Sequence, residues 1–143
     1  MAKKDVIIGL GEIGLPLFNL ISKFTIAEGY DIKPELRNKP KFSQYENLDV
    51  LFLHICIPFS KNFFREIYSL YKKYNPQAIV IHSTVSPYTT KNLQKKLPIP
   101  VIYSATRGIH KRMLSDLKRY TKFYAIEPKA PRAKWASSTF SLL

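Results

Sequence analysis

The sequence predicts an α/β fold in which a doubly wound parallel sheet of about six strands carries helices on both faces. Short apolar runs rich in β-branched residues alternate with segments whose apolar residues recur at helical spacing. The connections between the apolar runs are long enough for the crossovers that parallel strands require. A length of 143 residues is typical of one domain, and 45% hydrophobic with 23% charged residues excludes wholesale disorder.

The elements follow one another in a regular order. Residues 5–10 form a short buried strand, and residues 11–22 place Ile13, Leu17, Leu20 and Ile21 on one helical stripe, with Pro16 in the first turn where it is tolerated. Residues 24–32 read as a second strand. Residues 33–47 are polar, contain two prolines, and predict a loop with at most one helical turn.

The second half repeats this alternation. Residues 49–58 are almost continuously apolar, which suits a strand covered on both faces. The predicted elements that follow are a helix to about residue 74 with Ser60 as N-cap, strand 78–85, helix 89–97, strand 101–105, helix 111–120 and strand 122–127. We expect the strand order 3-2-1-4-5-6, a domain over residues 1–128, and a basic tail or the start of a linker over residues 129–143.

The most informative motif joins the first strand to the first helix. Gly9, Gly11 and Gly14 have the spacing G-x-G-x-x-G. Gly9 permits a tight turn, Gly11 lets a pyrophosphate approach the backbone, and Gly14 lets the helix pack closely on the sheet. The helix N-terminus offers unpaired N–H groups to phosphates. This context predicts a Rossmann-type dinucleotide-binding domain.

An acidic residue supports the same prediction. Asp31 follows Gly9 by 22 positions and ends the second predicted strand. A carboxylate there accepts hydrogen bonds from the ribose hydroxyls of NAD and repels the 2′-phosphate of NADP. We therefore expect NAD rather than NADP as the cofactor, although Lys33 and Arg37 nearby work against that preference. The alternative is that Asp31 is a turn residue at a strand end.

Several segments carry a resemblance to a known family. They are G-L-G-E-I-G-L-P-L at 9–17, Y-D-I at 30–32, C-I-P at 56–58, H-S-T-V-S-P-Y-T-T-K-N-L at 82–93 and Y-S-A-T-R-G-I-H-K-R-M at 103–113. In this order they resemble the N-terminal domain of the UDP-glucose/GDP-mannose 6-dehydrogenase family. The resemblance runs from about residue 4 to about residue 127.

The resemblance implies a cofactor half of an enzyme that uses NAD and a catalytic Cys to oxidise a sugar-nucleotide alcohol to a carboxylate. It implies that Gly9, Gly11, Ile13 and Gly14 line the pyrophosphate turn and that Asp31 holds the ribose. It also implies that Pro58 and Thr84 approach the cofactor from the strand ends. Glu12 stands where many members have an aromatic residue, and it either contacts a ribose or substrate or is plain surface.

The sequence departs from the family in ways that bear on catalysis. The G-F-G-G-x-C segment with the catalytic Cys is absent, and the only Cys, Cys56, lies in an apolar strand where a thiol is usually an inert small hydrophobe. We therefore predict no catalytic residue in this chain. Three interpretations follow: a separate partner chain supplies the thiol and the substrate domain, the chain senses NAD, or it is a remnant of the enzyme. Tyr88 replaces the Gly of P-G-T-T, and Thr106 replaces the Glu of Y-S-P-E-R.

The net charge of +13 opens a second interpretation. The stretch from Arg107 to Lys122 is dense in basic residues, and it is either a solvated helix face or an anion-facing surface. Arg107, His110 and Arg112 are the candidates for contact with a substrate phosphate or an acidic partner. The alternative function is a non-enzymatic basic module on the same fold that contacts nucleic acid or an acidic partner.

Other classes fit less of the sequence. A methyltransferase would also use an acid after the second strand, but the complete glycine motif argues against it. His54, His82 and His110 lack metal-ligand spacing, and the first two read as histidines within strands. No apolar run reaches the roughly 20 residues that span a bilayer, and the N-terminus lacks the pattern of a secretory signal, so we expect a cytoplasmic protein without a membrane partner.

Overall fold

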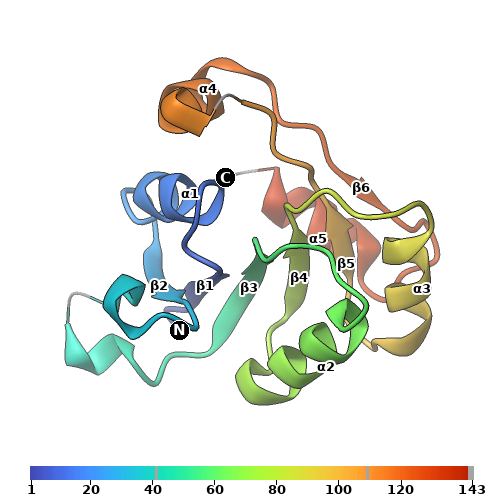
Figure 1. Cartoon of the computed structure of the whole chain (residues 1–143). Coiled ribbons are helices and arrows are strands. Elements are labelled where there is room, and N and C mark those ends of the chain that lie inside the picture. Colours follow the sequence, from blue (N-terminus) through green and yellow to red (C-terminus); the bar gives the residue numbers. More distant parts are fainter. Residues whose placement is uncertain (41, 109, 142–143) are drawn as a thin grey trace.

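Six strands form a single sheet in the order β2-β1-β3-β4-β5-β6 (Figure 1). The computed structural model describes residues 1–40, 42–108 and 110–141, without the side chain of His110. All strand pairs are parallel except β5 with β6. The strands are β1 (Lys4–Ile8), β2 (Ile26–Tyr30), β3 (Val50–Ile55), β4 (Ala78–Ile81), β5 (Val101–Tyr103) and β6 (Ala125–Ile126). The predicted α/β class with a mostly parallel sheet is confirmed.

Five α-helices in the described part of the chain connect or follow the strands. They are α1 (Gly14–Ile21), α2 (Phe63–Tyr74), α3 (Thr89–Lys96), α4 (Met113–Arg119) and α5 (Ala133–Phe140). Short 3₁₀ turns cover Pro34–Leu36, Ser43–Tyr45 and His110–Arg112. None of the helices described is long and apolar enough to cross a membrane.

The strand order differs from the expected 3-2-1-4-5-6 at one strand, because β3 pairs with β1 instead of lying outside β2. Five of the six residues of β3 are buried, so this strand needs a neighbour on each side and a cover on each face. The polar connection after β2 contains Pro34, and its described residues form 3₁₀ turns and one bridge, Gly29 to Asn38. The order reverses between β1 and β3.

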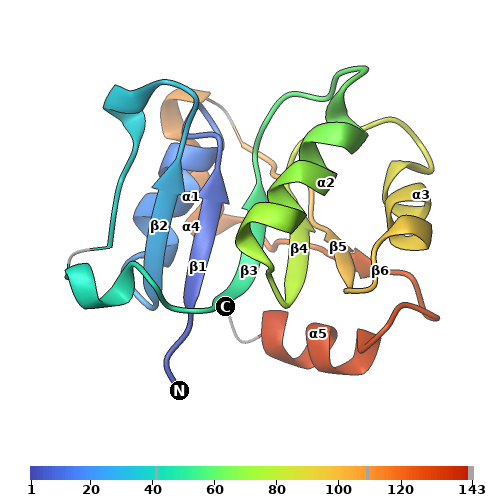
Figure 2. The same ribbon diagram turned by 90° about the horizontal axis from the view of Figure 1, so that it is seen from below.

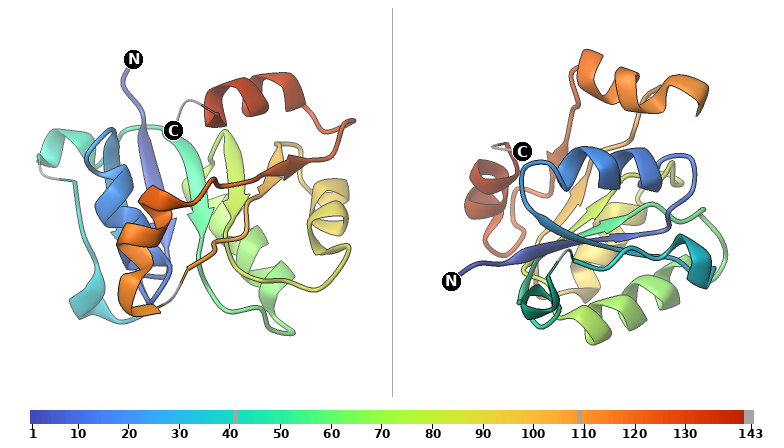
Figure 3. Two further views of the ribbon diagram at one scale, coloured as in Figure 1. Left: turned by 90° about the horizontal axis from the view of Figure 1, so that it is seen from above. Right: turned by 90° about the vertical axis from the view of Figure 1, so that its left-hand side faces the viewer.

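The last strand also departs from a purely parallel sheet. α4 contacts α1 instead of returning along the sheet beside β5 (Figure 3). The chain therefore runs back across the end of the sheet, and β6 pairs antiparallel to β5.

Helices lie on both faces of the sheet (Figures 2 and 3). Alternation along the strands divides the core between these two faces. Leu53 and Ile55 of β3 face α2 and α3, in a cluster with Phe63, Ile67 and Leu93. On the opposite face Ile7 packs under α1, and Phe52 packs under α5. Both faces are therefore covered, as a parallel sheet requires.

The segment expected to be a tail or the start of a linker contains α5. Ala136 is fully buried against Phe52 and Val80, and Trp135 and Phe140 pack at the edge of the same cluster. The sequence shows few apolar residues here, but a small buried Ala flanked by two aromatic residues is enough to dock one helix face. Whether this helix continues into a linker stays a prediction.

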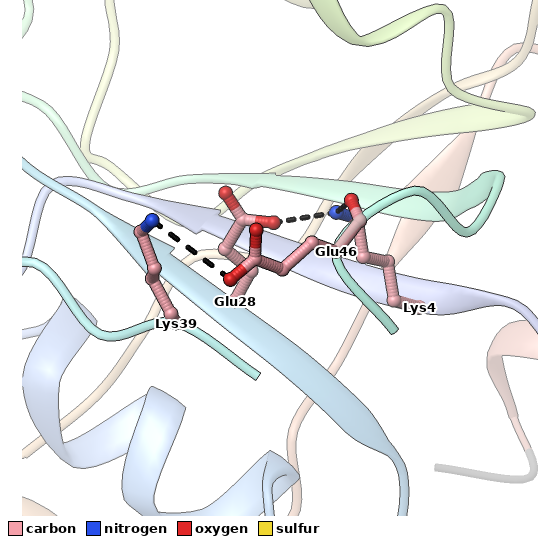
Figure 4. A network of polar contacts seen from close by, with 4 residues as sticks. All are labelled: Lys4, Glu28, Lys39 and Glu46. Atoms are coloured by element: carbon pink, nitrogen blue, oxygen red, sulfur yellow. Dashed lines mark hydrogen bonds and ion pairs between the residues drawn. The ribbon is translucent and has the colours of Figure 1, made fainter. Parts of the chain in front are cut away.

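A buried lysine ties the polar connection after β2 to the sheet (Figure 4). Lys4 on β1 has a side chain only 5% exposed, and its ammonium group pairs with Glu28 of β2 and donates to the carbonyl oxygen of Glu46. Lys39 and Glu46 form a second, exposed pair whose charged atoms lie 3.8 Å apart. Lys4 therefore joins two strands and a loop that are distant in sequence.

We expect Lys4→Ala to lower the free energy of unfolding by about 2–3 kcal/mol, because it leaves the half-buried Glu28 carboxylate and the Glu46 carbonyl without this donor. Urea unfolding at neutral pH measures the change. The control is Lys39→Ala, which removes an exposed ion pair and should change the free energy by less than about 0.5 kcal/mol. Equal effects of the two substitutions would contradict the assignment.

The residue before α3 is held in an unusual backbone conformation. Tyr88 has φ +66° and ψ 0°, in the left-handed region, and its side chain is 73% exposed. This is the position at which the resembling family has Gly. A residue other than Gly in this left-handed backbone conformation costs about 1 kcal/mol. The loop thus retains the shape that suits Gly in spite of the tyrosine.

Tyr88→Gly is expected to stabilise the fold by about 1 kcal/mol, because it relieves the left-handed strain and removes little buried surface. Thermal or urea unfolding checks this. Tyr88→Ala keeps the Cβ atom and serves as the control that should show no such gain. A loss of stability in Tyr88→Gly would show that the ring carries a contact that outweighs the strain.

Candidate functional site

A large cleft opens where the parallel strands end and their order reverses. Its volume is about 1240 Å³. It lies at the carboxyl ends of β1, β2, β3 and β4, the place where open α/β sheets bind ligands. Among the residues predicted to contact a cofactor, those that line it are Gly9, Gly11, Glu12, Ile13, Asp31, Pro58 and Thr84.

The three glycines of the turn have different surroundings. Gly9 has φ +88°, and a Cβ atom there would lie 3.0 Å from the Cys56 carbonyl oxygen. A Cβ atom at Gly14 would lie 1.6 Å from the carbonyl oxygen of Gly9, so only Gly lets α1 begin here. A Cβ atom at Gly11 would meet no protein atom within 4 Å. Gly11 therefore faces open space. Gly14 does not line the cleft, and its role is to let α1 pack closely against the end of β1.

Asp31 is anchored to the glycine turn itself. The N–H of Leu10 donates to Oδ2 of Asp31 over 2.8 Å, and the N–H of Lys33 donates to Oδ1 over 2.9 Å. These two backbone hydrogen bonds, more than the charges of Lys33 and Arg37, lower the pKa of Asp31. The carboxylate is charged at neutral pH, sits at the cleft wall and retains acceptor capacity for further donors.

Arg37 is turned away from that carboxylate. Its Nε donates to the main-chain oxygen of Asp31 over 2.7 Å, and its guanidinium lies 4.6 Å from the centroid of the Tyr30 ring. Of the two basic residues that work against a preference for NAD over NADP, Lys33 lines the cleft and Arg37 does not.

Other lining residues come from elements in which the motifs gave no indication. They are Arg65, Glu66, Ser69 and Leu70 on α2 and Phe59 and Ser60 before it. A helix that follows a strand of a parallel sheet starts at the carboxyl edge, so the first turns of α2 had to lie near the cleft. That topological rule, rather than any residue pattern, was the available indication.

Cys56 lines the cleft just past β3, but its environment disfavours nucleophilic chemistry. Burial raises the pKa of its thiol to about 12, and the Lys122 ammonium only partly opposes this. The thiolate is the reactive form of Cys. The prediction that this Cys is chemically inert therefore has a physical basis in the structure.

We expect native Cys56 to react with iodoacetamide at pH 8 roughly a thousandfold more slowly than a Cys of ordinary pKa, because the thiolate fraction falls tenfold for each unit of the pKa. Mass spectrometry of timed samples measures the rate. Labelling in urea is the control, since unfolding exposes the thiol. Complete labelling of the folded protein within minutes would contradict the expectation.

Two of the three residues proposed for anion contact, Arg107 and Arg112, do not line the large cleft. Arg107 lines a smaller cleft of about 210 Å³ with Lys122 and Tyr120, and its guanidinium lies 5.7 Å from the Phe123 ring centroid. Arg112 is exposed at the start of α4 and lines neither cleft. The side chain of His110 lies outside the described residues. A role of this group in binding stays a prediction.

Solved structures of two sugar-nucleotide dehydrogenases share this fold. The UDP-N-acetyl-mannosamine dehydrogenase of Staphylococcus aureus is 17% identical with a TM-score of 0.65, over 99% of this chain and 46% of that one. The NDP-N-acetyl-D-galactosaminuronic acid dehydrogenase of Methanosarcina mazei is 18% identical with a TM-score of 0.62, over 98% and 42%. No protein-family model and no curated protein matches the sequence.

These comparisons define a fold. The chain corresponds to less than half of the length of either enzyme. Together with the cleft at the strand ends and the glycine turn, they place the chain in the structural class of Rossmann-type α/β domains found in sugar-nucleotide dehydrogenases. At these identities the likeness carries the architecture only.

Proposed function

We propose that the chain binds NAD and is the cofactor half of an oxidoreductase of the nucleotide-sugar 6-dehydrogenase type. The observation that carries the proposal is the junction of Asp31 with the glycine turn. The Leu10 N–H holds the Asp31 carboxylate at the edge of a cleft whose floor at Gly11 is free of neighbouring atoms. A diphosphate at Gly11 and a ribose at Asp31 are the groups that this pairing suits.

The preference for NAD follows from the charge at Asp31. The two backbone hydrogen bonds keep the carboxylate ionised through the neutral range, and an ionised carboxylate repels a 2′-phosphate. Lys33 reduces this repulsion without removing it, and Arg37 is engaged with Tyr30 and the main chain. NAD is accordingly the proposed cofactor and NADP the weaker ligand.

Oxidation of an alcohol to a carboxylate by this family's chemistry needs a thiol, and this chain offers only Cys56. With a raised pKa and a place in the sheet, Cys56 does not serve. The proposed activity therefore requires a substrate domain and a catalytic Cys from another segment or a separate chain. Bound NAD would supply the hydride acceptor, and this chain's residues would bind and orient it.

The space above Gly11 provides the sharpest test. Gly11→Val should change the free energy of unfolding by less than about 0.5 kcal/mol, because a Cβ atom there meets no protein atom within 4 Å. The same substitution should weaken NAD binding more than tenfold, because the side chain would occupy the diphosphate position. Titration calorimetry with NAD and a melting curve measure both. Leu15→Val, on the exposed side of α1, is the matched control. Unchanged NAD affinity in Gly11→Val would refute the proposed site.

Asp31→Asn tests the cofactor preference. We expect NAD affinity to fall about tenfold and NADP affinity to fall less, because the substitution removes a charged acceptor and a repulsion together. Calorimetry with each nucleotide gives the ratio. Glu35→Gln, an exposed acid that does not line the cleft, is the control. No heat with either nucleotide at millimolar concentration in the unmodified protein would end the NAD hypothesis.

A further inference from the structure

Three ionisable side chains form a row through the interior of the sheet, next to the cleft. They are Asp5 on β1, His54 on β3 and His82 just after β4, and each is only 1% exposed. Nδ1 of His54 lies 2.8 Å from Nε2 of His82, and Nε2 of His54 lies 3.6 Å from Oδ2 of Asp5. The two imidazole rings lie 22° from parallel with centroids 5.1 Å apart.

The bond between the two rings limits how many protons the pair can hold. One ring nitrogen donates and the other accepts, so the accepting nitrogen carries no proton. The pair therefore cannot consist of two imidazolium cations while this bond exists. Within the described residues, Oδ2 of Asp5, Nε2 of His54 and Nδ1 of His82 have no well-formed hydrogen bond, so each member of the row has one buried polar atom whose desolvation is not compensated by a hydrogen bond.

The groups that face the row add to this limit. Cys56 comes directly after β3. The ammonium of Lys122 donates to the Ser104 carbonyl oxygen over 2.8 Å and to Thr106 Oγ1 over 3.1 Å. Burial, His54 and Lys122 lower the pKa of His82 well below its ordinary value, and a backbone contact with Ser104 only partly opposes them. Burial also lowers the pKa of Lys122 to about 8. α1 and α5 cover this face with apolar side chains.

His82 is also coupled mechanically to the cleft. The main-chain N–H of His82 donates to the Ile55 carbonyl oxygen over 2.9 Å, and the main-chain carbonyl oxygen of His82 accepts from the Thr106 N–H over 3.2 Å. The next residue, Ser83, donates from its hydroxyl to the Ile57 carbonyl over 2.5 Å. Ser83, Thr84 and Ile57 line the cleft. A displacement of His82 toward water therefore moves part of the cleft wall.

We propose that the Asp5–His54–His82 row is an acid-operated switch. When both histidines become imidazolium cations, the His54–His82 hydrogen bond breaks, His82 moves toward water and the adjoining cleft wall opens. In the closed state the pair holds at most one imidazolium, whereas exposed histidines take up both protons near pH 6.5. The closed state is therefore stable above about pH 6.5 and loses stability as the pH falls below it. That this releases a dinucleotide rests on the proposed function; the opening itself does not.

Unfolding without nucleotide tests the switch directly. The comparison uses the unmodified protein and the triple variant Asp5→Val/His54→Phe/His82→Val, which replaces the row by apolar side chains. When the pH falls from 7.5 to 5.5, the unfolding equilibrium constant should rise in both proteins. The fold-change in the unmodified protein should be at least about ten times the fold-change in the triple variant. His110→Gln, which removes the remaining histidine, should behave as the unmodified protein does. Equal pH responses in all three would overturn the proposal.

The ring resonances of the unmodified protein keep the proposal testable even where the triple variant does not fold. Nuclear magnetic resonance of the imidazole nitrogens follows the three histidines as the pH is lowered, with His110→Gln identifying one of them. At least one ring of the His54–His82 pair should stay neutral until the cleft wall opens, so the second ring should become imidazolium only below about pH 6.5 and together with the acceleration of Cys56 labelling. Titration of both rings to imidazolium near pH 6.5 in the folded protein would contradict the switch.

Two readouts examine the cleft itself. NADH fluorescence titration should show at least fivefold weaker binding at pH 5.5 than at pH 7.5 in the unmodified protein and less than twofold in the triple variant. Labelling of the lining residue Cys56 by 4,4′-dithiodipyridine, compared with the triple variant at each pH, should accelerate at pH 5.5. Absence of NADH binding at pH 7.5 would refute the proposed function, whereas absence of acid-accelerated labelling would refute the switch.

Discussion

The close approach of α1 to the end of β1 is the constraint on which the rest of the structure depends. A Cβ atom at Gly14 would lie 1.6 Å from the carbonyl oxygen of Gly9, and Gly9 itself has φ +88° with the Cys56 carbonyl oxygen 3.0 Å from where its Cβ would be, so the turn needs Gly at both positions. The turn sets where the helix N-terminus points, and it brings the Leu10 N–H to the Asp31 carboxylate. Through that bond the ends of β1 and β2 are held in the relation that a dinucleotide requires.

The cleft at this edge of the sheet has groups suited to binding a cofactor but no reactive thiol. Under the proposed function, the glycine turn and Asp31 would bind a diphosphate and a ribose, while the thiol in the cleft wall, Cys56, is held protonated by its burial. Chemistry at a nicotinamide would therefore depend on groups from outside this segment. The chain covers less than half of the sugar-nucleotide dehydrogenases whose fold it shares.

Burial of polar groups is unusually prominent in the interior. Lys4 is paired with Glu28 and caps the Glu46 carbonyl, so its charge is compensated. The Asp5–His54–His82 row is compensated only in part, because each of its members has one atom without a well-formed hydrogen bond in the described structure. Since buried polar groups are costly when unsatisfied, the first arrangement stabilises the fold, whereas the second makes its stability depend on protons.

The sequence by itself determined the α/β class, the glycine turn and the place of Asp31, because these follow from local periodicity and from residues whose conformational role is independent of their neighbours. It did not determine the position of β3, which depends on competition between strands for the centre of the sheet, or the docking of α5, which depends on Ala136 meeting Phe52. The contact of His54 with His82 was likewise decided only by the tertiary structure. The two residues are 28 positions apart. The register of β3 with β4 pairs His54 with Val80, which places His82 two residues further along on the same face, where its ring lies within hydrogen-bond distance of that of His54.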